Sequence, residues 1–307
     1  MVIERELRLE RRPHLVASLG VLRRGGGDPT WRAEGPASFW KGWQTPQGPV
    51  AARLSEDIPG RAVRLEAHGP GADWLAEALP GLVGEGDADE GFDPVHEAVA
   101  RARRRFPGWR VPRTGMVVEA LVPAIIEQKV TGVQAFGAYR LLVRRFGEPA
   151  PGPGAELGLR VAPTAQGWAR IASWEWLQAG VDAQRADTLM RALRSAGRLE
   201  RLVEREPAAA REALRVIPGV GVWTAAEVAQ RAFGDADAVS FGDYHVARNI
   251  GWALTGVCVD DGGLAELLQP YAGHRYRVQR LLELVGARRP RRGPRMSVPT
   301  HLPVRRG

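Results

Sequence analysis

The sequence contains little cysteine, little lysine and no long apolar run. Cys258 is the single cysteine in 307 residues, so no internal disulfide, no zinc site of several thiolates and no four-cysteine iron–sulfur cluster can form. Residues 1–12 carry acids and bases where a signal peptide needs an apolar stretch. No apolar run reaches the length of a membrane span. These absences predict a cytoplasmic protein without membrane contact.

The excess of positive charge lies at the C-terminal end. The formal net charge is +8, yet ten arginines and a single acid, Glu283, lie between Pro270 and the C-terminus, which leaves residues 1–269 close to neutral. Basic segments rich in Pro and Gly are commonly solvated and flexible. We therefore interpret residues 288–307 as a flexible basic tail, and charge alone does not indicate nucleic-acid binding.

Residues 1–90 predict a small β-rich domain. Residues 61–67 alternate as a half-buried strand does, and short apolar runs at 14–22, 39–43 and 50–54 are separated by Gly, Pro and Gln. We expect an antiparallel sheet with one face covered by a helix over residues 73–82. The aromatic side chains of this region are expected in its core: Trp31, Phe39, Trp40 and Trp43.

The remainder of the chain predicts helices. An acidic, Gly-rich linker at 84–91 precedes a helix expected to start at Asp93 and Pro94 and to end near 105. Residues 115–286 give about eleven helical segments, with a Pro/Gly loop at 147–158. The predicted fold class is α+β, with a helical domain at 91–287 and the tail at 288–307.

A Gly-punctuated turn, VIPGVGVWT, occupies residues 216–224. Pro218 cannot continue the preceding helix, and glycines at 219 and 221 allow positive φ and close backbone approach. The N–H groups at the start of the next helix would then suit a DNA phosphate. The alternative is a plain connection between two antiparallel helices. The candidate phosphate-binding residues are Ile217, Gly219, Val220, Gly221 and Thr224.

Asp243 follows this turn by about twenty residues, within SFGDYHV at 240–246. It opens a predicted helix, so a simple N-cap is one interpretation. A catalytic carboxylate is the other, and the two are compatible because the N–H donors of a cap also hold the carboxylate ionised.

The LxxxPGVGxWTA pattern at 214–225, followed by Asp-Tyr at 243–244, resembles the helix-hairpin-helix DNA glycosylase superfamily. The chain looks most like the bacterial 3-methyladenine DNA glycosylase II family. Further matches are IIEQ at 125–128, QRA at 184–186 and GHRY at 273–276. The resemblance covers roughly residues 93–286.

This resemblance implies a helix-hairpin-helix bundle that flips a damaged base out of duplex DNA and hydrolyses its N-glycosidic bond during base excision repair. Asp243 is then the catalytic residue, which stabilises positive charge on the sugar or orients water. We expect a nucleoid-associated monomer whose partner is double-stranded DNA containing damaged bases. No cofactor is required, although a monovalent cation at the hairpin carbonyls is compatible with the family.

Trp223 indicates the subtype. Bifunctional members of the superfamily carry a lysine at this place, which forms a Schiff base with the sugar, and a tryptophan cannot do so. The chain has only two lysines, Lys41 and Lys129. The resemblance therefore predicts a monofunctional enzyme, and the single cysteine excludes the iron–sulfur subfamily.

The expected base pocket contains Trp223, Tyr244, Gln128 and Glu227. The two aromatic rings are candidates for stacking on a cationic alkylated base, or are core residues. Lys129 is the candidate wedge that fills the gap left by the flipped nucleotide, although the family has an apolar residue there. Glu227 stands where the family resemblance leads us to expect an aromatic residue. Our hypothesis is that its negative charge favours cationic lesions. A catalytically inactive DNA-binding module and a helical scaffold are the competing interpretations.

Overall fold

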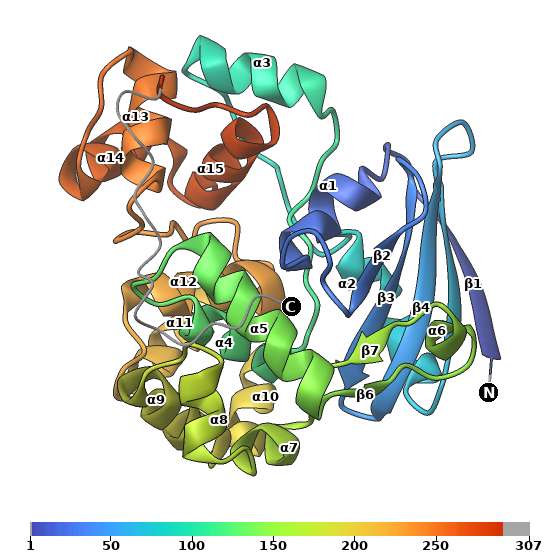
Figure 1. Ribbon diagram of the computed structural model, residues 1–307. Helices are drawn as coiled ribbons and strands as arrows, with labels where there is room; N and C mark the ends of the chain where they lie inside the picture. Colours follow the sequence, from blue (N-terminus) through green and yellow to red (C-terminus); the bar gives the residue numbers. More distant parts are fainter. Residues whose placement is uncertain (1, 291–307) are drawn as a thin grey trace.

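The computed structural model describes residues 2–290; residue 1 and positions 291–307, which include most of the predicted tail, lie outside the described residues. The chain forms a sheet domain and two groups of helices (Figure 1). The sheet contains β1 (Val2–Arg8), β2 (Trp31–Ala33), β3 (Ser38–Thr45), β4 (Gly48–Asp57) and β5 (Ala62–His68). Its strands are antiparallel in the order β1-β5-β4-β3-β2.

Both faces of the sheet are covered around β3. Phe39 and Trp43 pack on the face that meets α2 (Ala72–Leu82), whereas Trp40 packs on the opposite face. This division follows from the alternation of side chains along a strand. The opposite face is covered by a segment with β6 (Glu148–Pro149), α6 (Pro153–Glu156) and β7 (Arg160–Val161). The predicted aromatic core and the covering helix are therefore present.

The middle group of helices surrounds α4 (Val117–Ile126). Nine of its ten residues are buried, and only Glu119 is partly exposed. Such a helix must be packed on all sides. The other members of this group are α5 (Gly132–Phe146), α7 (Ala165–Ala169), α8 (Ser173–Gln178), α9 (Ala183–Leu193), α10 (Ala196–Glu200), η2 (Arg201–Glu204), α11 (Pro207–Arg215), α12 (Val222–Val228) and η3 (Ala229–Phe233).

The second group of helices combines distant parts of the sequence. It contains α3 (Glu97–Arg105), α13 (Val246–Thr255), α14 (Asp261–Leu268), η4 (Gln269–Tyr271) and α15 (Arg275–Leu284), which share one apolar core. Figure 1 shows α3 beside α13 and α15, with α14 on the far side of α13, and the whole group apart from the middle group. A buried ion pair between Asp87 and Arg277, at 2.7 Å, ties the start of this group to α15.

Several local predictions are wrong in detail. Residues 15–22 are not extended but form α1 (Leu15–Leu19) and η1 (Gly20–Leu22). The helix expected at Asp93 begins at Glu97, because His96 has an extended backbone. The loop at 147–158 contains β6 and α6 and packs on the sheet. Residues 84–91 do form a loop, as predicted, and this loop is anchored, since the side chain of Asp87 is 5% exposed.

Candidate active site

The predicted hairpin joins α11 to α12. Gly219 has φ +96°, and a Cβ there would lie 2.3 Å from Thr188 Oγ1, so both backbone shape and packing require glycine. Gly221 does not use the positive φ that glycine allows, because its φ is −90°, and apart from its neighbours along the chain no described atom lies within 4 Å of the place a Cβ would occupy. Gly221 is exposed, and no side chain from the described residues caps α12. The backbone surface at Gly221 is therefore open to close approach.

The five phosphate-binding candidates do not share one environment. Gly219 and Gly221 are exposed and Ile217 is half-buried. Val220 is 4% exposed and Thr224 is 2% exposed, so their side chains belong to the interior. The Thr224 hydroxyl accepts a hydrogen bond from Gln128 at 2.8 Å. Any contact of Val220 or Thr224 with a phosphate would have to come from the backbone.

The hairpin carbonyl groups already have partners. Ile217 O accepts from Val220 N at 2.9 Å, and Pro218 O accepts from Arg191 Nε at 3.3 Å. Gly219 O accepts from Gln128 Nε2 at 2.9 Å. The guanidinium at Pro218 O opposes a cation at that oxygen, whereas Ile217 O and Gly219 O accept from uncharged donors and each keep a second lone pair. The monovalent cation that the resemblance allows stays a prediction. Within residues 2–290, no group of three or more His, Cys, Asp or Glu residues could hold a metal ion.

Asp243 is held in the turn before α13 by three N–H donors. Its Oδ1 accepts from the backbone N–H groups of His245, at 2.7 Å, and Val246, at 3.1 Å. Its Oδ2 accepts from the indole Nε1 of Trp223 at 3.3 Å. The first two bonds form an Asx turn just before α13, whose N-cap position is His245, whereas the third links the carboxylate to α12. Asp243 therefore fixes the turn that leads into α13 without occupying its N-cap position, and it is a neighbour of the hairpin helix.

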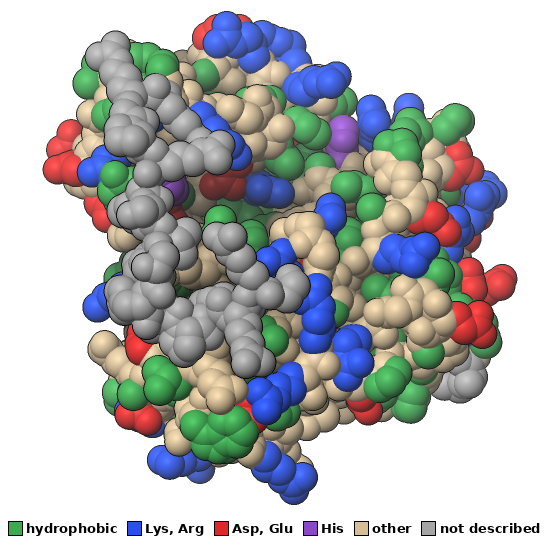
Figure 2. All heavy atoms as spheres, viewed as in Figure 1, with side chains coloured by type: hydrophobic (Ala, Val, Ile, Leu, Met, Phe, Trp, Pro, Cys, Tyr) green, Lys and Arg blue, Asp and Glu red, His purple; other side chains and the backbone are tan. Residues whose placement is uncertain are grey.

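The carboxylate of Asp243 contributes to a cavity of about 470 Å³ between the two groups of helices. This size lies in the range of roughly 300–1,000 Å³ for small-molecule sites. Figure 2 shows a hollow there, with acidic and basic side chains together at its edge. The lining residues from helices include Glu227, Gln230 and Arg231 of α12 and η3, Val246, Asn249 and Ile250 of α13, and Tyr276, Gln279 and Glu283 of α15.

A polar network forms one wall of this cavity. Glu227 pairs with Arg231 at 2.8 Å and accepts a hydrogen bond from the Ser240 hydroxyl at 2.6 Å. Burial opposes the charge of Arg231, but Glu227, together with Tyr276 and Glu127, outweighs burial and raises the pKa of the guanidinium. Burial also raises the pKa of Tyr276 to about 12, which keeps its hydroxyl neutral. The wall therefore offers both hydrogen-bond donors and acceptors.

The other base-pocket candidates lie outside the cavity lining. Tyr244 is 65% exposed, and the guanidinium of Arg248 lies 4.3 Å from its ring centre. Trp223 contacts the carboxylate of Asp243 but does not line the cavity, and Gln128 is bonded to the hairpin. Lys129 is exposed in the turn after α4. The structure therefore brings together Asp243 and Glu227, and it adds residues from η3 and α15 that the sequence motifs did not indicate.

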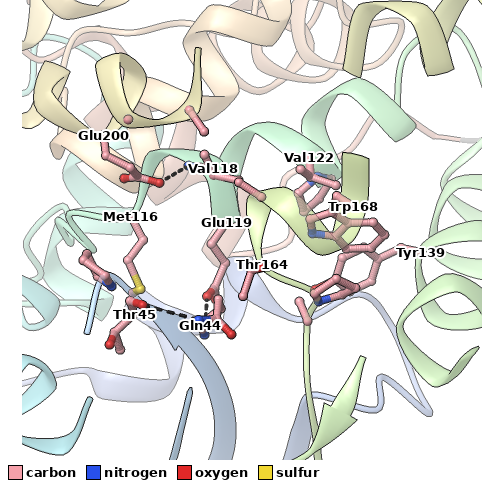
Figure 3. A pocket seen from close by; sticks show the side chains of 17 residues that line it. Gln44, Thr45, Met116, Val118, Glu119, Val122, Tyr139, Thr164, Trp168 and Glu200 are labelled. Atoms are coloured by element: carbon pink, nitrogen blue, oxygen red, sulfur yellow. Dashed lines mark hydrogen bonds between the residues drawn. The ribbon is translucent and has the colours of Figure 1, made fainter. Parts of the chain in front are cut away.

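A second cavity, of about 260 Å³, lies between the sheet domain and the middle helices. Figure 3 shows Tyr139 and Trp168 on one side of it and Met116 and Glu200 on the other. The Glu200 carboxylate accepts the N–H groups of Val117 and Val118, each at 2.8 Å, and burial raises its pKa. This carboxylate caps the start of α4 and therefore has a structural role.

Comparison with known proteins identifies the fold. No protein-family model matches the chain, and no curated protein matches it in sequence. Its structural neighbours are nevertheless DNA glycosylases, and the chain has the α+β helix-hairpin-helix fold of these enzymes, as the sequence predicted.

Three similar structures define this likeness. The 3-methyladenine DNA glycosylase from Archaeoglobus fulgidus has 19% identity and a TM-score of 0.73, with 92% of this chain and 98% of that chain covered. MBOgg1, solved with a low-affinity DNA ligand, has 16% identity and a TM-score of 0.68, covering 92% and 95%. The 8-oxoguanine glycosylase/lyase from Clostridium acetobutylicum has 12% identity and a TM-score of 0.64, covering 92% and 98%.

Proposed function

We propose that the protein is a monofunctional DNA glycosylase that removes damaged bases, alkylated purines in particular, from duplex DNA. The observation that carries this proposal is the Asp243 carboxylate, oriented by Trp223 and two backbone N–H groups beside a cavity. The glycosylase fold supports it, and one similar structure is that of a DNA complex. A monomer acting on duplex DNA is part of the same proposal.

The chemistry follows from the position of the carboxylate. As the bond between the sugar C1′ and the base breaks, its electron pair leaves with the base and positive charge develops on the sugar. Asp243 stabilises that charge and accepts a hydrogen bond from the attacking water. Water supplies the new C1′–O bond, and its proton is released. Extrusion of the nucleotide brings C1′ out of the stack and is least costly for a damaged base.

The absence of lyase activity is inferred from the two lysines. Trp223 occupies the hairpin position where an amine would act. Lys41 is 3% exposed and pairs with Glu119 at 2.9 Å, so it cannot reach a sugar. Lys129 projects from a turn outside the cavity lining. Hydrolysis by water is therefore the favoured reaction.

The test is a panel of duplexes that each contain one defined lesion: 3-methyladenine, hypoxanthine or 8-oxoguanine. We expect release of free 3-methyladenine, with strand breaks only after alkali treatment and no covalent adduct after borohydride. Failure to release any alkylated base would contradict the proposed substrate class. Strand cleavage without alkali would contradict the monofunctional assignment.

A further inference from the structure

The turn at residues 127–129, which follows α4, is fixed by three separate contacts. On one side, Gln128 donates to Gly219 O at 2.9 Å and to Thr224 Oγ1 at 2.8 Å, which ties the turn to the hairpin. Below it, Arg185 donates to the carbonyl of Ile126 at 2.6 Å. The third contact comes from the sheet domain and is an ion pair.

That ion pair joins Arg24 to Glu127. Arg24 Nε lies 2.7 Å from Glu127 Oε1, with the two side chains 5% and 17% exposed. Neither atom makes a hydrogen bond with the described residues, so the ion pair is the polar contact that each of them has. Loss of either partner would therefore leave a poorly solvated charge. Arg24 is fixed in turn, because its backbone N–H donates to Asp28 and its Nη1 donates to Val21 O.

Lys129 is the residue that this arrangement leaves exposed. Its φ is +55°, a left-handed conformation that residues other than glycine rarely adopt. Such a conformation persists when surrounding contacts enforce it. The neighbours of Lys129 are bonded to the sheet domain and to the hairpin, so its cationic side chain projects from a rigid support beside the hairpin.

The same ion pair borders the candidate active site. Val21, which accepts the hydrogen bond from Arg24, lines the cavity that contains Asp243. The charge of Glu127 also contributes to the raised pKa of Arg231, another lining residue. The 127–129 turn is thus linked both to the hairpin and to the cavity.

We propose that Arg24 is a positioning residue of the sheet domain, which acts through Glu127 to hold the 127–129 turn and present Lys129 to the DNA at the extruded nucleotide. This inference rests on the proposed function. It assigns the sheet domain a role in DNA engagement without requiring the sheet itself to touch DNA. Arg24 acts through the turn and not on the reacting atoms.

The experiment measures binding to a duplex with a tetrahydrofuran abasic analogue opposite 2-aminopurine, whose fluorescence reports local unstacking. This readout does not require base excision. We expect Lys129→Ala and Arg24→Met each to weaken binding by about fivefold to tenfold and to reduce the fluorescence change. The double variant should lose no more than Arg24→Met alone, because Arg24 acts through Lys129. Arg24→Lys, which retains the charge, should recover most of the binding.

Arg144→Gln is the matched control. Arg144 of α5 donates to Gly27 O at 2.6 Å, so this variant removes a different contact between the helices and the same loop of the sheet domain. It does not touch the turn, and we expect wild-type binding. If Arg24→Met does not fold, Glu127→Gln tests the same contact from the other side.

The possible failures are distinct. Additive losses in the double variant, or equal effects of Arg24→Met and Arg144→Gln, would refute the positioning role. If the wild-type protein binds the abasic-analogue duplex no better than intact duplex, the proposed function itself fails and the positioning role fails with it.

Discussion

Substitution of Asp243 by asparagine separates the charge of the carboxylate from its structural role. An asparagine oxygen can still accept from the N–H groups of His245 and Val246, so the Asx turn before α13 is retained. The contact with Trp223 Nε1 is lost, because the amide would present a donor to a donor. This change should cost about 1 kcal/mol of stability.

The effect on excision should be much larger. A full charge about 4 Å from the developing charge on the sugar contributes roughly 4 kcal/mol at the effective dielectric constant of a partly exposed site. That energy corresponds to about a thousandfold in rate. The measurement is single-turnover release of the damaged base, accompanied by binding to the abasic-analogue duplex. We expect excision to fall about a thousandfold while binding changes only a few-fold.

Asp261→Asn is the control for removal of a nearby charge. The Asp261 carboxylate accepts a hydrogen bond from the N–H of Gly242, the residue before Asp243, at 2.8 Å. Asp261 does not line the cavity. This variant should retain most of the excision rate. A loss of less than tenfold in Asp243→Asn, or equal losses in the two variants, would refute the assignment of Asp243.

Three further predictions follow from the structure. Glu227→Ala removes the partner of buried Arg231 and should destabilise the fold by about 3 kcal/mol in chemical denaturation. Glu227→Gln tests the role of the charge in lesion choice. Equal excision of hypoxanthine and 3-methyladenine by wild type and this variant would eliminate the hypothesis that Glu227 favours cationic lesions. Gly219→Ala should disrupt the hairpin, since the new Cβ would meet Thr188. Gly221→Ala should fold normally and weaken DNA binding, because the space beside Gly221 is open. A wild-type dissociation constant for Gly221→Ala would show that no phosphate approaches there. Burial and Arg277 lower the pKa of His274 in the folded protein below the ordinary 6.5. The unfolded chain therefore takes up the proton first, and stability is lost as the pH falls from 6.5 through the lower folded pKa. Denaturation of His274→Gln should show a smaller loss of stability over this pH window, and an unchanged loss would contradict the linkage.

Local patterns predicted the fold class and the order of the main features. The alternation at 61–67 corresponds to β5, and the Gly-punctuated turn connects two helices as expected. Asp243 could be proposed as a functional residue because a motif marked its place in the sequence. The backbone conformation of the hairpin could not be predicted, since glycine permits a positive φ without requiring it, and Gly221 does not adopt one.

The cavity itself depends on contacts that sequence spacing does not reveal. Gln279 and Tyr276 occupy an ordinary amphipathic helix, and only the tertiary fold brings α15 to the same cavity as η3. Tyr244 shows the converse case, because its position next to Asp243 does not bring its ring into the cavity. The Arg24–Glu127 pair joins two domains and has no local signature. A motif thus locates a chemical group, while packing determines its surroundings.

The helix group around α15 has a consequence for how the protein is made. Its core joins residues 92–111 to residues 239–284, with the entire middle group inserted between them in the chain. During synthesis, α3 cannot meet all of its apolar partners until α15 has left the ribosome. The chamber that contains Asp243 therefore cannot close before α15 is made, and a nascent chain that lacks α15 leaves one of its walls missing.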